Sequence, residues 1–288
     1  MKTRILVGIP IGLILIAALV LQSWVLIGLI LLLSIAGQYE IIKALESKGS
    51  RVIKSVPFIF AAASLPVLLF IKPQTLSFEI LLALFVVCLM LLFVIAMFSS
   101  KYDFISLQKS VLAMVYPQLF LIFAYLIAIQ FTSMQFIGTN PVVLVMAVVP
   151  PVFCDIFAYF FGRAFGKRKL CPLISPKKTV AGSIAGLVGG LTAALLIWIF
   201  MASGLFIHSL TWNMDVINFL ILGVAVAGVS QFGDLSASFI KRYYEIKDYG
   251  KILPGHGGIL DRVDSILFSL PIVYLYFIVY NSYAAAIS

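Results

Sequence analysis

Long apolar stretches separated by short polar segments dominate the chain. Nine of them approach the roughly 20 mostly apolar residues that an α-helix needs to cross a bilayer. They cover approximately 5–21, 24–39, 56–71, 80–98, 111–130, 141–162, 181–203, 217–238 and 265–282. The first two are closely spaced, which favours a tight hairpin around Gln22 and Ser23. The pattern predicts an all-α polytopic membrane protein with about nine transmembrane helices.

The composition supports the bilayer as solvent. The chain has 288 residues, of which 63% are hydrophobic and 11% charged, whereas a soluble domain carries about 25% charged residues. Its cysteines show neither metal-ligand spacing nor an even-numbered disulfide framework. A basic N-terminus precedes the first apolar stretch without a small-residue cleavage site, so we expect a retained span.

The positive charges predict the topology. If the N-terminus is inside and the spans alternate, all of the 20 lysines and arginines except Lys72 lie on the inside. Inside segments are enriched in such residues, so the bias predicts a cytoplasmic N-terminus, an outside C-terminus and a multi-pass inner (plasma) membrane location. The net charge of +9 is spread over short loops. That placement fits lipid headgroups or phosphate ligands and argues against nucleic acid.

Unusual polar residues concentrate between residues 150 and 264. We therefore predict an N-terminal part, 1–140, with about five spans, and a catalytic part, 141–288, with cytoplasmic loops 163–180 and 239–264. Asp155 lies in the sixth apolar stretch and Asp234 near the inner end of the eighth. Ionisable groups at such depth are costly and by default indicate a functional site.

The last cytoplasmic loop has the components of phosphate chemistry. If the eighth helix continues past Asp234, then Asp234, Ser238 and Lys241 share one face at i, i+4 and i+7. The glycine-rich turn at 254–258 cannot be regular helix, and its N–H groups could form an anion-binding nest. Carboxylates, ammonium groups and such a turn are what metal-assisted phosphoryl or nucleotidyl transfer requires.

Each of these residues also has a simpler interpretation. The basic side chains could be topological anchors. Asp261 and Asp264 could be the acidic residues that a helix N-terminus favours, and His256 could be an ordinary loop histidine. These interpretations explain each residue but not their density, so we favour a site.

Two blocks of residues resemble a known family. One reads Ser238-x-x-Lys241-Arg242-x4-Lys247-Asp248-x5-Pro254-Gly255-His256-Gly257-Gly258-x2-Asp261-Arg262-x-Asp264. The other reads Asp155-x-x-Ala158-Tyr159-x-x-Gly162-Arg163-x-x-Gly166-Lys167, followed by Ser175-Pro176-Lys177-Lys178-Thr179. Together they are similar to the signature of CDP-diacylglycerol synthases (phosphatidate cytidylyltransferases). The resemblance is strong from about 150 to 265 and compatible in hydropathy before that.

The resemblance implies a reaction and a set of residues. CTP and phosphatidate would give CDP-diacylglycerol and diphosphate, with Mg²⁺ as cofactor. Asp234 and Asp261 resemble the family's metal ligands, and Asp264 a supporting carboxylate. The positions that match polar catalytic-site residues are Ser238, Lys241, Arg242, Lys247, His256 and Arg262. A second, monovalent cation and a homodimer stay open.

The substrate-binding positions lie mostly in the other block. We expect contacts to CTP or to the acidic lipid headgroup from Asp155, Arg163, Lys167, Ser175, Lys177, Lys178, Thr179, Gly257 and Gly258. A structural role for Asp155 is about as well supported. Arg168 and Lys169 could make the same phosphate contacts, but for Lys167, Arg168 and Lys169 anchoring alone is an open alternative. Beyond them, glycines at 182, 186 and 190 have the spacing of close helix packing.

Two departures and two alternatives accompany this prediction. The family commonly has Glu where this chain has Ala181 and Ala237, which puts the detailed metal geometry in doubt. An isoprenoid ether lipid phosphate could replace phosphatidate, because apolar helix surfaces accommodate both kinds of chain. A transporter is the alternative from another class, but no inverted repeat is visible and the polar residues cluster at the cytoplasmic face.

Overall fold

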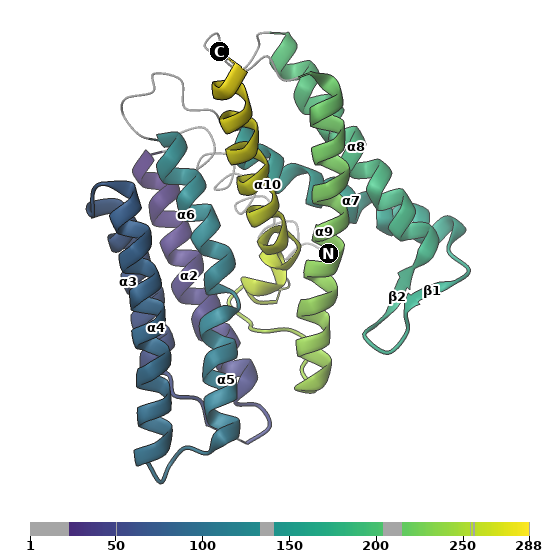
Figure 1. Cartoon of the computed structure of the whole chain (residues 1–288). Helices are drawn as coiled ribbons and strands as arrows, with labels where there is room; N and C mark the ends of the chain where they lie inside the picture. The colour runs from purple at the N-terminus through teal and green to yellow at the C-terminus, as the bar shows by residue number, and fades with distance from the viewer. Residues whose placement is uncertain are drawn as a thin grey trace. The chain divides into compact units, whose positions relative to one another are not determined.

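Helices dominate the computed structural model, which describes residues 23–49, 51–132, 141–203, 215–253, 255 and 257–287. In chain order the elements are α2 (Ser23–Leu45), α3 (Ser55–Phe70), α4 (Gln74–Phe98), α5 (Phe104–Val115), α6 (Gln118–Thr132), α7 (Pro141–Phe165), β1 (Lys169–Cys171), β2 (Ser175–Thr179), α8 (Val180–Ala202), α9 (Val216–Tyr243) and α10 (Leu260–Ile287) (Figure 1). The predicted all-α class is confirmed apart from the short β1–β2 pair.

Seven helices in the described part of the chain are long and apolar enough to cross a membrane. Their bounds are Trp24–Leu45, Gln74–Phe98, Phe104–Ile129, Val142–Phe165, Val180–Ala202, Val216–Tyr243 and Leu260–Tyr280. Of the predicted stretches, 5–21 lies outside the described residues, and 56–71 corresponds to the shorter apolar helix α3. These findings support a multi-pass membrane protein, while the count of nine and the orientation of the termini stay predictions.

Two elements depart from the predicted boundaries. The stretch at 111–130 is divided between α5 and α6 at Pro117, whose ring nitrogen cannot donate a hydrogen bond. The loop at 163–180 contains the antiparallel pair β1–β2, with Lys169 opposite Thr179 and Cys171 opposite Ser175. Strands of three and five residues that carry several lysines give no apolar alternation, so the pattern did not reveal them.

The contacts divide the chain into two compact units. Unit 1 comprises 1–130 with 240–263, and unit 2 comprises 131–239 with 264–288. The 240–263 segment, which contains most of the predicted loop 239–264, is thus grouped with the N-terminal helices. The predicted catalytic part, 141–288, stays a prediction, because compactness does not locate chemistry.

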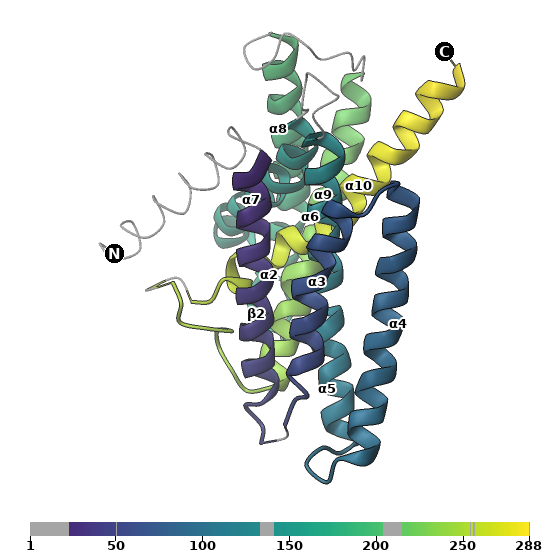
Figure 2. The ribbon, with the colours of Figure 1, turned by 90° about the vertical axis from the view of Figure 1, so that its left-hand side faces the viewer.

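Buried polar side chains join three helices of unit 1. The hydroxyl of Ser34 in α2 donates to the side-chain Oε1 of Gln118 in α6 at 2.6 Å. The side-chain Nε2 of Gln118 donates to the hydroxyl of Ser64 in α3 at 2.8 Å. All three side chains are buried, so each polar group finds its partner inside the unit. In the same unit α3 packs against α2 and α4, and Figure 2 shows these helices side by side.

Glycines of α8 allow close helix packing in unit 2. A Cβ on Gly186 would lie 2.7 Å from the sulfur of Cys154 in α7, and a Cβ on Gly190 would collide with Ala227 in α9. The predicted packing role of these glycines is therefore confirmed. Close approach of α7, α8 and α9 brings their polar residues to a common cavity.

Candidate functional site

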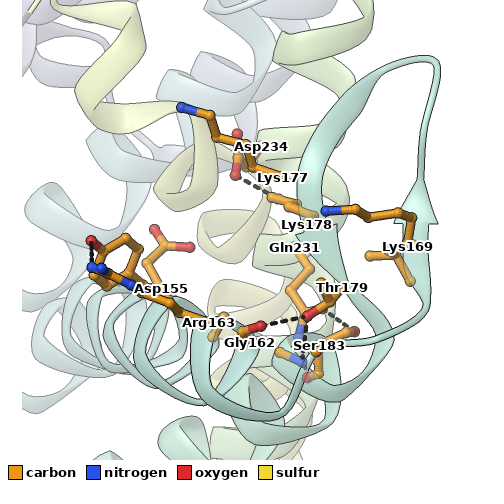
Figure 3. Close-up of a pocket in the computed structure, with 15 residues that line it drawn as sticks. Asp155, Gly162, Arg163, Lys169, Lys177, Lys178, Thr179, Ser183, Gln231 and Asp234 are labelled. Atoms are coloured by element: carbon orange, nitrogen blue, oxygen red, sulfur yellow. Dashed lines mark hydrogen bonds and ion pairs between the residues drawn. The ribbon is translucent and has the colours of Figure 1, made fainter.

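A cavity of about 640 Å³ lies in unit 2, between α7, the β1–β2 hairpin, the start of α8 and α9 (Figure 3). That volume is in the usual range for small-molecule sites. The charged residues that line it are Asp155, Arg163, Lys169, Lys177, Lys178 and Asp234. Four cationic side chains and two carboxylates thus surround one cavity, an arrangement suited to a polyphosphate and a cation.

Helix α7 supplies three of the lining residues at four-residue intervals. Asp155, Tyr159 and Arg163 therefore lie along one face of the helix. Ser265 donates a hydrogen bond to Oδ2 of Asp155 at 3.4 Å, and Arg163 donates to the hydroxyl of Tyr159 at 3.5 Å. Tyr159 and Arg163 are exposed, so their polar ends are available to a ligand.

Thr179 joins the end of α7 to the start of α8. Its Oγ1 accepts the N–H of Gly182 at 3.1 Å as the N-cap of α8, and it donates to the carbonyl of Gly162 at 3.4 Å. A Cβ on Gly166 would collide with both Gly162 and Thr179. The junction is therefore tight, and it fixes the strand that carries Lys177 and Lys178. A substrate contact by Thr179 stays a prediction.

Asp234 is held by groups from two elements. Lys178 forms an ion pair with its Oδ2 at 2.5 Å, and Ser238, one turn later in α9, donates to its Oδ1 at 3.4 Å. The side chains of Lys178 and Asp234 are 26% and 27% exposed, so the pair is shielded but still reachable from the cavity (Figure 3). Helix α9 runs to Tyr243, which confirms that it continues past Asp234.

The sequence interpretation missed two polar residues that line the cavity, Gln231 and Ser183. Gln231 donates to the carbonyl of Ser183 at 3.1 Å and accepts a short hydrogen bond from the Ser183 hydroxyl. An amide one turn before Asp234, inside an apolar stretch, was the available signal. Lys169, for which the sequence left both a phosphate contact and a simple anchor open, lines the cavity, whereas Lys167 and Ser175 are not among its lining residues.

The cavity offers carboxylates suited to Mg²⁺. Asp155 and Asp234 both line it. Mg²⁺ is usually held by one or two carboxylates together with water and substrate phosphates, so this pair fits. Across the described ranges, no group of three or more His, Cys, Asp or Glu side chains gathers as a metal cage.

In unit 1, Asp261 organises the loop between α9 and α10. Its Oδ1 pairs with the Lys241 ammonium at 2.7 Å, and its Oδ2 accepts the N–H groups of Tyr249 and Gly258 at 2.8 and 3.0 Å. The Lys241 and Asp261 side chains are only 11% and 5% exposed. Asp261 thus has three close donors and is 5% exposed, whereas Asp234 has two and is 27% exposed, so Asp261 has less capacity for a metal than Asp234.

The glycine-rich turn has the predicted backbone conformation. Gly255 and Gly257 have φ of 78° and 86°, which favours glycine, and Leu253 and Gly257 exchange backbone hydrogen bonds of 3.0 and 3.1 Å. The N–H of Gly258 goes to Asp261, and those of the next two residues go to Glu40. Of these three donors only Gly258 belongs to the turn considered as an anion-binding nest, and its N–H binds a carboxylate of the chain itself. Substrate contacts by Gly257 and Gly258 stay predictions. Pro254 and His256 lie outside the described residues.

Glu40 is the unit 1 residue that the sequence interpretation missed. Its side chain is 1% exposed, and its two oxygens accept the N–H groups of Ile259 and Leu260 at 3.0 and 2.9 Å. No chemistry was assigned to the loops of the first five stretches. An acid at the end of the apolar stretch 24–39 was the only signal, and nothing in the sequence pairs it with residues 219 and 220 positions away.

The start of the same loop is bound to the residues that follow α2. Ser47 donates to the carbonyl of Tyr244 at 2.9 Å, and Lys48 pairs with Glu245 at 2.8 Å. Hydrogen bonding to Lys48 holds the pKa of the exposed Glu245 carboxyl below its ordinary value. The loop therefore has fixed points at both ends.

The other predicted catalytic residues have varied surroundings. Arg242, Lys247 and Arg262 are exposed. Asp264 is 8% exposed, and its Oδ1 accepts the N–H of Ser265 at 2.8 Å. Ala237 is fully buried in α9. Their roles stay predictions.

The sequence model of the cytidylyltransferase family matches residues 2–280, nearly the whole chain. The chain belongs to the cytidylyltransferase family. Phosphatidate cytidylyltransferase of Staphylococcus haemolyticus is 31% identical over 279 residues, covering 95% of this chain and 97% of that protein. The Bacillus subtilis protein of the same name is 32% identical over 286 residues, covering 95% and 96%.

A shorter stretch is more similar. The Staphylococcus saprophyticus phosphatidate cytidylyltransferase is 44% identical over 119 residues, which span 41% of this chain and 42% of that relative. The family predicted from the two residue blocks is thus confirmed, and so is the enzyme class, a nucleotidyltransferase. Membership of an enzyme family also favours the enzyme over the transporter.

Proposed function

We propose that the chain is a phosphatidate cytidylyltransferase, which converts CTP and phosphatidate to CDP-diacylglycerol and diphosphate at the cytoplasmic face of the inner membrane. The observation that carries this proposal is the unit 2 cavity, where four cationic side chains and two carboxylates surround a space of about 640 Å³. The names of relatives that align over nearly the whole chain support the same substrates.

In this reaction an oxygen of the phosphatidate phosphate attacks the α-phosphorus of CTP. A phosphorus–oxygen bond forms between the two substrates, the bond from the α-phosphorus to the bridging oxygen breaks, and diphosphate leaves with the electron pair. The protein need not form a covalent intermediate. Positioning the substrates and neutralising their charge would provide most of the catalysis.

The cavity residues have complementary roles in this scheme. Arg163, Lys169 and Lys177 would bind phosphate oxygens and neutralise the charge that develops on diphosphate. Asp155 and Asp234 would hold Mg²⁺, which supplies Lewis-acid polarisation of the phosphates when bound. Lys178 balances the charge of Asp234 in the absence of the cation.

The loop of unit 1 is assigned to the reaction by its match to the family signature. We propose that Lys241 and Asp261 serve catalysis as a buried ion pair that keeps the ammonium in one orientation. Roles for Ser238, Arg242, Lys247, His256, Arg262 and Asp264 belong to the same proposal, as do the substrate contacts of Lys167, Ser175, Thr179, Gly257 and Gly258.

Turnover of labelled CTP by the purified chain tests the function. We expect CDP-diacylglycerol to form only when phosphatidate is present, to stop when a chelator is added and to resume with excess Mg²⁺. An isoprenoid ether lipid phosphate serves as the competing acceptor. Preference for that acceptor, or a rate of CTP turnover that does not depend on phosphatidate, would contradict the proposed substrate.

A substitution in the hairpin tests the cavity. Lys177→Ala removes a cation that lines the cavity, so we expect the KM for CTP to rise about tenfold, the usual effect of losing one charge-assisted hydrogen bond. Arg168→Ala, on the same segment but outside the cavity lining, should keep the wild-type KM. Equal effects of the two substitutions would show that the segment acts through overall charge.

A further inference from the structure

The carboxylate of Glu40 is enclosed by the backbone that leads into α10. Its two oxygens accept the N–H groups of Ile259 and Leu260 at 3.0 and 2.9 Å. The first N–H groups of a helix have no acceptor within that helix, and its N-terminus favours a negative charge. Glu40, from α2, therefore provides both the acceptors and the negative charge that the start of α10 favours.

Two glycines leave room for this carboxylate. A Cβ on Gly258 would lie 2.5 Å from Oε2 of Glu40, and a Cβ on Gly250 would collide with Oε1. The loop thus closes on Glu40 from two positions in its sequence. The Glu40 cradle, defined as Gly250 and 258–260, matches the carboxylate in shape as well as in hydrogen bonding.

The same backbone holds Asp261. The N–H of Gly258 donates to Oδ2 of Asp261 at 3.0 Å, directly before the two N–H groups that Glu40 receives. Three consecutive N–H groups are therefore divided between the two carboxylates. A shift of residues 258–260 would displace Asp261, and with it the ammonium of Lys241 that pairs with Asp261 at 2.7 Å.

We propose that Glu40 is a positioning residue, which fixes the backbone at 258–260 and so sets the place of Asp261 and Lys241 during turnover. The role rests on the proposed function, in which those two residues serve the reaction. Glu40 acts through the loop and needs no contact with substrate.

Glu40→Gln tests the hydrogen bonds. Glutamine keeps the shape but offers one acceptor oxygen, so its NH₂ group faces one of the two backbone N–H donors. We expect faster hydrogen exchange in the peptide 249–261 and unchanged exchange in α4 and α8. Because the catalytic groups are then misplaced, kcat should fall about tenfold to a hundredfold, with little change in the KM for CTP.

Glu46→Gln is the matched control. Glu46 follows closely in the chain, accepts the N–H of Val52 at 3.3 Å and pairs with Lys54 at 2.8 Å, so it stabilises a different segment. We expect wild-type turnover and wild-type exchange in 249–261. A loss equal to that of Glu40→Gln would show that general weakening of unit 1 is responsible, and it would overturn the proposal.

Gly250→Ala provides a second variant that keeps the Glu40 charge. Its methyl group would push the carboxylate out of the cradle, so the variant should reproduce faster exchange and lower kcat. In the Glu40→Ala background the same methyl meets no carboxylate, and the double variant should be no worse than Glu40→Ala alone. If the losses in kcat of Gly250→Ala and Glu40→Ala added up in the double variant, the proposal would be overturned.

The two measurements separate the possible failures. Unchanged hydrogen exchange in peptide 249–261 of both Glu40→Gln and Gly250→Ala would refute the claim that Glu40 holds the loop. Faster exchange with wild-type kcat would refute the positioning role. A wild-type chain that turns over no CTP would instead refute the proposed function, and the exchange measurement would still show whether Glu40 holds the loop.

Discussion

Replacing Asp261 by Asn should reduce CTP turnover by about a hundredfold or more, a loss typical of removing a charged group from a preorganised site. Asp261 receives three donors, the Lys241 ammonium on one oxygen and two backbone N–H groups on the other. Either orientation of the Asn amide brings its NH₂ group against a donor. Breaking this shielded ion pair also leaves the ammonium without its counter-charge, a cost of roughly 3–5 kcal/mol for a buried pair.

A kinetic comparison with a nearby charge checks this expectation. Glu245→Gln removes a carboxylate from the same loop, but Glu245 is exposed and its ion pair with Lys48 is of the surface type, which contributes little. We expect its kcat and KM to match the wild type. Full activity in Asp261→Asn would exclude Asp261 from the site, and equal losses in both variants would implicate loop charge in general.

Asp234→Asn should lower kcat/KM by about a hundredfold and raise the Mg²⁺ concentration needed for half-maximal rate, because a neutral amide is a weaker ligand for a hard cation. The substitution also removes the partner of Lys178, which pairs with Asp234 at 2.5 Å. Initial rates measured across a Mg²⁺ titration report both effects.

Two further variants distinguish the loss of a metal ligand from the loss of the ion pair with Lys178. Asp215→Asn changes an exposed acid just before α9 begins and should leave the Mg²⁺ titration unchanged. Lys178→Ala removes the ion pair but keeps the carboxylate, so it should reduce activity without raising the Mg²⁺ requirement. An unaltered Mg²⁺ titration in Asp234→Asn would show that this carboxylate does not bind the metal.

Hydrophobicity alone was enough to locate the helices. Eight of the nine predicted stretches coincide with described helices, because a bilayer admits few other structures for an apolar segment of that length. Local rules also excluded regular helix at 254–258, where Gly255 and Gly257 have positive φ, and α9 meets the condition that it continues past Asp234. Each of these features depends on residues close together in the sequence.

The parts of the site that sequence could not predict depend on distant pairings. Glu40 binds backbone groups 219 and 220 residues away, and Lys178 finds Asp234 only because α8 and α9 pack closely. Nothing local reveals that the N–H of Gly258 binds Asp261 or that those of Ile259 and Leu260 bind Glu40. Charge and glycine content indicate phosphate chemistry, whereas the partner of each charge is decided by the tertiary fold.

The long separation between Glu40 and its partners also bears on biosynthesis. At roughly 5–20 residues per second, the ribosome needs about ten to forty seconds to make the segment between them. Throughout that interval the Glu40 carboxylate lacks the N–H groups that receive it in the finished protein, so it is expected to stay hydrated at the membrane surface. The N-terminal helices can enter the bilayer early, but the end of α2 that carries Glu40 acquires its final structure only after residues 259 and 260 have been made.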